Sequence, residues 1–72
     1  MIRKLFKESV ILLTGTNMNL RSAEIKLKIL QYKYRNSEEY KNLRIKEYGE
    51  EQKDAWSKPY KVYGIIADYF GN

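Results

Sequence analysis

The sequence predicts an all-α domain, a small bundle of three or four short helices in which the second helix is central and has two apolar faces. Apolar residues recur at steps of three and four along much of the 72-residue chain, which is the spacing of one helix face. Residues that commonly cap helices stand near the expected ends, among them Asn19 and Ser37. Because so short a chain leaves no room for a second core, we expect residues 1–72 to form a single small helical domain.

The first predicted helix lies within residues 1–14. Its apolar face would consist of Ile2, Leu5, Phe6 and Leu13. Gly15 follows at the position where a glycine cap is common at the C-terminal end of a helix. The segment TGTNMN, residues 14–19, is then predicted to be a short connection. We expect the first helix to pack on the core rather than to act as a detachable anchor.

The segment EIKLKILQYKYR, residues 24–35, alternates apolar and basic residues as a half-buried strand does. As a strand, however, it would slip out of phase at Leu30 and would need a bulge there. As a helix it has a continuous seam of apolar residues, Leu20, Ala23, Leu27, Leu30 and Tyr34. Asn19 is a good N-cap for such a helix, which is therefore the preferred prediction. The alternative is an α+β fold in which residues 24–35 and 40–48 form a hairpin.

A helix at this position has a second apolar seam. At about 100° per residue, Ile25, Ile29 and Tyr32 fall nearly opposite the first seam. Two basic stripes separate the seams, with Arg21, Lys28 and Arg35 on one side and Lys26 and Lys33 on the other. One core needs only one seam, so we expect the second to contact another chain. The predicted partner-binding residues are Arg21, Ile25, Lys26, Lys28, Ile29, Tyr32, Lys33 and Arg35.

Two further helices are predicted in the second half of the chain. The first would start at residue 38 after an N-cap at Ser37 and could break at Gly49. Its weak apolar stripe would consist of Ile45, Tyr48 and Ala55, with Trp56 beside them. The last helix would start near Ser57 and end at Gly71. One of its faces would carry Val62, Ile65, Ile66, Tyr69 and Phe70.

The chain contains neither histidine nor cysteine, so the commonest general base, the commonest metal ligands and the thiol nucleophile are absent. The carboxylates at helical spacing that remain as candidate cation ligands are Glu47, Glu50, Glu51 and Asp54. We expect them to form a solvated acidic face, because hard-cation sites normally draw ligands from a shaped loop. The sequence therefore predicts no catalytic, cofactor-binding or metal-binding residue and no cofactor, and we expect the protein not to be an enzyme.

The net charge of +5 is unevenly distributed. Residues 1–36 carry eight basic and two acidic side chains, a charge of +6, whereas residues 37–72 carry six basic and seven acidic side chains, a charge of −1. This asymmetry favours an anionic partner for the first half. The chain also contains seven tyrosines, a residue type that is enriched where surface is buried against a partner.

These observations predict a non-enzymatic protein-interaction module. A small chain rich in Lys, Asn and Tyr is typical of a phage or mobile-element protein, which would act as an inhibitor or accessory protein of a host macromolecular complex. We expect the partner to be a protein, and a subunit of a complex that handles nucleic acid would fit. A second copy of this chain is another candidate partner. The alternative function is a small basic nucleic-acid-binding protein that contacts phosphates through residues 21–35. The apolar run Val10–Leu13 is too short for a signal peptide or a membrane span, so we expect a cytoplasmic protein that does not bind membranes.

Overall fold

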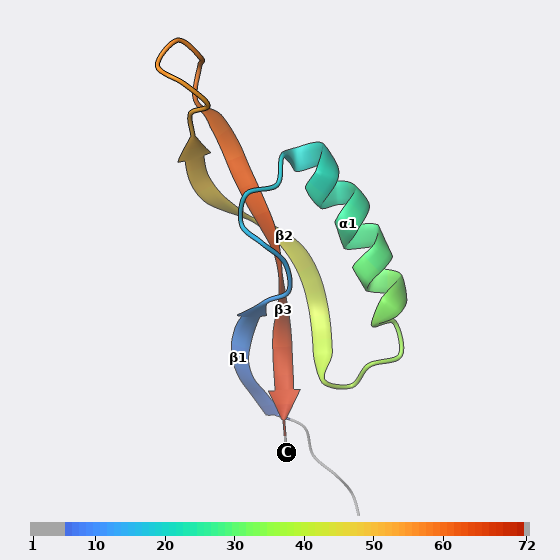
Figure 1. Cartoon of the computed structure of the whole chain (residues 1–72). Coiled ribbons are helices and arrows are strands. Elements are labelled where there is room, and N and C mark those ends of the chain that lie inside the picture. Colours follow the sequence, from blue (N-terminus) through green and yellow to red (C-terminus); the bar gives the residue numbers. More distant parts are fainter. Residues whose placement is uncertain (1–5, 72) are drawn as a thin grey trace, which may run out of the picture.

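A three-stranded antiparallel sheet with one helix on one of its faces makes up residues 6–71, the part of the chain that the computed structural model describes (Figure 1). Its elements are β1 (Phe6–Leu12), α1 (Leu20–Lys33), β2 (Tyr40–Glu51) and β3 (Tyr60–Gly71). The predicted all-α bundle, a small helical protein, is therefore wrong, and the fold is α+β. The alternative hairpin of residues 24–35 with 40–48 is wrong too, because the first of these segments is mostly helical and the hairpin joins β2 to β3.

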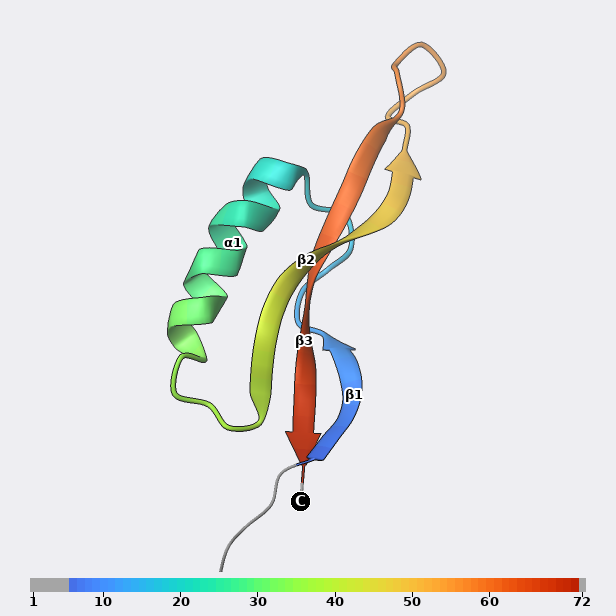
Figure 2. The same cartoon turned by 180° about the vertical axis from the view of Figure 1, so that it is seen from behind.

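The last strand of the chain lies in the centre of the sheet, in the order β1-β3-β2. β1 and β2 both run antiparallel to β3, so α1 connects two parallel strands at opposite edges of the sheet. The helix packs on β2 and β3, as views from the two sides show (Figures 1 and 2). The predicted connection at residues 14–19 is confirmed, and a bridge between Met18 and Tyr63 attaches it to β3.

The central helix is the element that the sequence predicts correctly. α1 begins after Asn19, whose side-chain oxygen accepts a 2.8 Å hydrogen bond from the amide of Ser22, as expected of an N-cap. Ala23 and Leu30, two residues of the predicted first seam, are buried. Helical spacing therefore identified the face of α1 that packs on the sheet.

The helix expected between Ser57 and Gly71 is instead the central strand β3. Residues 64–68 are all buried, because α1 covers one face of the strand and side chains of the edge strands cover much of the other. A strand that is buried on both faces loses the alternation by which strands are recognised in a sequence. The β-branched and aromatic residues of this segment, which favour strands, were the signal for its true conformation.

The helix expected within residues 1–14 is also wrong in its described part, which forms β1. Gly15 consequently caps no helix, and Ile2 and Leu5, two residues of the expected apolar face, lie outside the described residues. β1 is stabilised as a strand by its pairing with β3 at the other end of the chain. A pattern confined to the segment itself contains no information about that pairing.

The helix expected from residue 38 is instead the edge strand β2. The hydroxyl of Ser37 accepts hydrogen bonds of 3.2 and 3.1 Å from the amides of residues 39–40. This resembles N-cap bonding, but Ser forms such bonds in turns as well, and here a strand follows. Gly49 has a φ of 110° within the register shift at residues 47–50, so it marks a β-bulge rather than a break in a helix.

The core lies between α1 and the sheet face that it covers. The buried side chains here include Ala23 and Leu30 of α1 and Ile65 and Ala67 of β3. Three tyrosine rings extend this core beyond the C-terminal end of the helix. The ring centroids of Tyr34 and Tyr40 are 5.1 Å apart, and those of Tyr40 and Tyr69 are 5.5 Å apart. Their tilted contacts join the end of α1 to β2 and β3.

Two truncations on α1 test this packing. Leu30 is 7% exposed and Ile29 is 54% exposed. Leu30→Ala should lower the free energy of unfolding by about 2–5 kcal/mol, because it leaves a cavity in the core. Ile29→Ala should change it by less than about 0.5 kcal/mol, because more than half of that residue's surface is exposed to solvent. Chemical denaturation followed by circular dichroism measures both, and equal losses for the two variants would contradict the orientation of the helix.

Candidate functional site

The outer surface of α1 carries an apolar row that the described chain does not cover. This outer seam consists of Ile25, Ile29 and Tyr32, with exposed fractions of 55%, 54% and 69%. The structure thus places the predicted second seam in solvent, on the side of the helix away from the sheet. All eight predicted partner-binding residues are exposed, seven on α1 and Arg35 just beyond its end. Their binding to a partner remains a prediction.

Basic side chains surround the outer seam. Residues 20–35 contain five basic residues and one acidic residue, a charge of +4. None of these five basic side chains forms an ion pair within residues 6–71. The Cζ of Arg35 lies 4.0 Å from the ring centroid of Tyr32, and its guanidinium donates a 2.8 Å hydrogen bond to the Tyr32 carbonyl oxygen. These contacts hold the positive charge of Arg35 beside the seam. Tyrosine and arginine are among the residues that contribute most to binding energy at protein interfaces.

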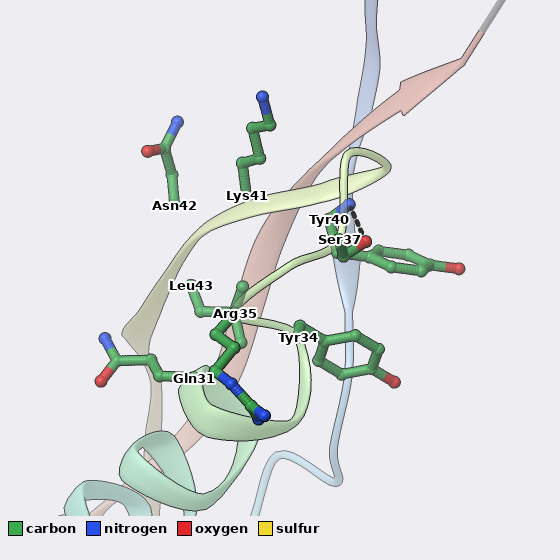
Figure 3. A pocket seen from close by; sticks show the side chains of 8 residues that line it. All are labelled: Gln31, Tyr34, Arg35, Ser37, Tyr40, Lys41, Asn42 and Leu43. Carbon is green, nitrogen blue, oxygen red and sulfur yellow. Dashed lines mark hydrogen bonds between the residues drawn. The ribbon is translucent and has the colours of Figure 1, made fainter.

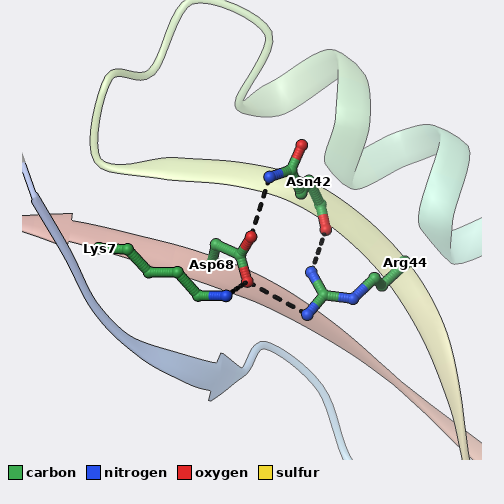
Figure 4. Close-up of polar contacts among 4 residues, drawn as sticks. All are labelled: Lys7, Asn42, Arg44 and Asp68. Carbon is green, nitrogen blue, oxygen red and sulfur yellow. Dashed lines mark hydrogen bonds and ion pairs between the residues drawn. The ribbon is translucent and has the colours of Figure 1, made fainter.

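A buried carboxylate connects all three strands of the sheet (Figure 4). Asp68 of β3 is 6% exposed. Its Oδ1 lies 3.3 Å from the Nζ of Lys7 on β1 and 3.1 Å from the guanidinium of Arg44 on β2. Its Oδ2 accepts a 2.9 Å hydrogen bond from the side-chain amide of Asn42. Asn42 has a φ of 57°, a left-handed conformation that asparagine adopts more readily than most residues.

These contacts keep Asp68 ionised. The pKa of Asp68 lies below its ordinary value of 3.8, chiefly because the Asn42 amide donates a hydrogen bond to the carboxylate. Lys7 and Arg44 lower the pKa further, whereas burial acts in the opposite direction. The carboxylate is thus a charged link between strands and not a proton donor near neutral pH.

Asp68 lies on the face of the sheet that α1 does not cover. Successive residues of a strand point to opposite faces, so β3 presents Ile65 and Ala67 to the helix and its even-numbered residues to the other side. Residues paired across antiparallel strands share a face. The open sheet face, as we call it, therefore contains Lys7, Val10 and Leu12 of β1, Lys41, Arg44, Lys46, Tyr48 and Glu51 of β2, and Tyr60, Val62, Gly64, Ile66, Asp68 and Phe70 of β3.

A pocket of about 360 Å³ lies where the end of α1 meets the start of β2 (Figure 3). It is lined by Gln31, Tyr34, Arg35, Ser37, Tyr40, Lys41, Asn42 and Leu43. Three of its polar side chains already have partners, since the Ser37 hydroxyl accepts backbone hydrogen bonds, Arg35 binds the Tyr32 carbonyl and the Asn42 amide binds Asp68. The side chains of Lys41 and Asn42 point away from Arg35 (Figure 3). The lining contains no carboxylate, histidine or cysteine, and we assign no reaction to this pocket.

The tip of the β2–β3 hairpin presents the single tryptophan of the chain. Trp56 is 95% exposed. The carboxylate of Asp54 organises the loop by accepting 2.9 Å hydrogen bonds from the amides of Trp56 and Ser57 and from the Ser57 hydroxyl. These bonds, that from the hydroxyl first, lower the pKa of Asp54 below 3.8. The helix predicted through these residues is a loop instead, and Asp followed by Ser and Pro59, which is typical of turns, was the signal for it.

The four acidic residues considered as cation ligands do not share a helix face. Three of them lie on β2, where Glu47 forms a 3.2 Å ion pair with Lys61 of β3, and Asp54 lies in the tip loop. Within residues 6–71, no three potential metal-ligating side chains are grouped together. The helical geometry that would have grouped these four carboxylates is therefore wrong.

Comparisons with known protein families, with curated proteins and with solved structures found no match. α1, of 14 residues, is the one helix within residues 6–71, and it is too short and too polar to cross a membrane. The candidate site is therefore defined by the geometry of the chain itself, as the outer seam with its basic surround.

The contacts of Asp68 predict an acid-sensitive contribution to stability. Its folded-state pKa lies below the unfolded value of 3.8, so the contribution is fully present above pH 3.8 and is lost as the pH falls through the folded-state pKa. The difference in melting temperature between wild type and Asp68→Asn should therefore be largest at about pH 6 and should shrink toward about pH 2. Glu38→Gln, an exposed residue without an ion pair in the described part of the chain, is the control. A difference that is constant across this range would contradict the assigned role of Asp68.

Proposed function

We propose that the protein is a non-enzymatic interaction module that binds an acidic protein partner through the outer seam of α1. The observation that carries this proposal is the exposure of Ile25, Ile29 and Tyr32 on a helix whose other face is already packed. Apolar patches that are exposed and rimmed by polar residues mark interaction sites. Two isoleucines and a tyrosine in one row along a helix can insert into an apolar groove of a partner or pack against one of its helices.

The charge around the outer seam defines the class of partner. The segment 20–35 has a charge of +4, and its basic side chains form no ion pairs within the described residues. A partner with an apolar groove and an acidic rim would pair with these charges, which favours rapid and specific association. Lys and Arg also have long apolar stems that extend the contact area beside the seam.

The proposal extends to the biological role of the module. A small binding module without histidine or cysteine suits an inhibitor or accessory protein of a phage or mobile element, which acts in the cytoplasm by occupying a site on a host complex. Such a protein needs no active site, since its effect comes from the surface that it covers. Direct contact of residues 21–35 with phosphates is the competing function, because the same unpaired charges would serve it.

The double variant Ile29→Ala/Tyr32→Ala tests the proposal. It should keep the melting temperature of the wild type, because both side chains are exposed, and should reduce the recovery of a nuclease-resistant protein partner by at least about tenfold. Quantitative pull-down from nuclease-treated lysate of host cells measures this recovery. The control is Val10→Ala, a similarly exposed aliphatic residue on the open sheet face.

Three outcomes would count against the proposal. Equal partner recovery by the double variant and by wild type would exclude the outer seam as the binding surface. Loss of the partner on nuclease treatment would favour the nucleic-acid function instead. Self-association of the pure protein that is abolished by the double variant, measured by sedimentation equilibrium, would show that the seam binds a second copy of the chain.

A further inference from the structure

The open sheet face has a second set of side chains that the proposed function does not use. It carries four basic residues and two acidic residues, a charge of +2. One acidic residue is the buried Asp68, whose charge is already balanced by Lys7 and Arg44. The other, Glu51, lies at the end of the face next to the hairpin tip, opposite Tyr60. Lys41 and Lys46 form no ion pairs within residues 6–71, so their charges are available to an anionic ligand.

Two aromatic rings of this face, those of Tyr48 and Phe70, each have an ammonium group over them. The Nζ of Lys46 lies 5.2 Å from the ring centroid of Tyr48, and the Nζ of Lys41 lies 5.7 Å from that of Phe70. A nucleotide has the two groups that this pairing fits, because its base can stack on a ring while its phosphate meets the neighbouring ammonium. The face contains two such pairs. Lys46 and Tyr48 both lie on β2, whereas Lys41 of β2 pairs with Phe70 of β3.

The two rings lie at different points along the sheet. A Cβ added to Gly64 would lie 3.1 Å from the Cε2 of Tyr48, which places that ring over Gly64 of β3. Phe70 lies six residues further along the same strand, a distance of about 20 Å at about 3.3 Å per residue. Between them lie the charged side chains of Arg44 and Lys7, held in place by Asp68.

We propose that the open sheet face binds single-stranded nucleic acid. Stacking on Tyr48 and Phe70 requires bases that are not paired in a duplex, which favours a single strand over a double helix. The contacts are to ring faces and phosphates, so binding would show little sequence preference. This surface lies across the sheet from α1, and the inference does not depend on the proposed protein partner.

Fluorescence anisotropy with a labelled single-stranded RNA of about 12 nucleotides tests the inference, with a duplex of equal length as the comparison. Tyr48→Leu and Phe70→Leu should each weaken binding of the single strand by about tenfold, because leucine keeps the apolar volume but cannot stack. Lys41→Gln/Lys46→Gln should flatten the slope of log K against log salt by about 1.4, at about 0.7 for each lost phosphate contact. Both lysines are exposed, so this variant should fold even if Phe70→Leu does not.

The matched controls lie on α1. Tyr32→Leu removes one exposed ring, and Lys26→Gln/Lys33→Gln removes two charges, on the other side of the molecule. Both should leave RNA affinity within about twofold of wild type, apart from a small change in long-range attraction. The Ile29→Ala/Tyr32→Ala variant, which should lose the protein partner, should keep this RNA affinity as well, so failure of one proposal is distinguishable from failure of the other.

Several results would overturn the inference. One is the absence of any binding to single-stranded RNA or DNA at low salt. Others are equal affinity for the duplex, or loss of binding in the α1 controls and not in the sheet variants. Binding to vesicles of anionic phospholipid, lost in the lysine variant and without binding to the single strand, would reassign the face to a membrane surface.

Discussion

The contacts of the buried Asp68 carboxylate hold the three strands in one register. A buried charge is tolerated only where ionic and hydrogen-bonding partners surround it. Asp68 obtains these partners from both edge strands, Lys7 from β1 and Arg44 with Asn42 from β2. A slip of either edge strand by one residue would turn its partner to the opposite face. The apolar contacts of the small core have no such directionality, so the carboxylate selects one arrangement among several that would bury similar area.

The position of β3 in the centre of the sheet then determines which surfaces remain available. A single helix of 14 residues covers one face of the sheet, and a chain of 72 residues has no second helix in its described part to cover the other. The outer seam of α1 and the open sheet face consequently lie on opposite sides of one thin domain. Both have basic surroundings and aromatic side chains. A protein with these two surfaces could contact a protein and a nucleic acid of one complex at the same time, without competition between them.

The parts of the structure that could be predicted are those with local determinants. The cap at Asn19, the buried Leu30 and the exposed Ile29 all follow from helical geometry within residues 19–33. The outer seam was predictable for the same reason, since its position depends only on rotation about the helix axis. The open sheet face was not predictable, because its residues come from three strands and are far apart in the chain. Nothing near Lys41 in the sequence indicates that its ammonium lies beside the ring of Phe70.

By itself, the sequence determined the lack of histidine and cysteine chemistry, the uneven positive charge and one capped helix with two faces. Each of these depends on composition or on residues a few positions apart, as the hydrogen bonds of a helix do. Only the tertiary structure decided that the remaining segments are strands and that Asp68 connects them. Strand pairing brings together residues as distant as Phe6 and Gly71, and a central strand covered on both faces shows no alternation of its own. Its conformation is set by neighbours in space, which no local pattern identifies.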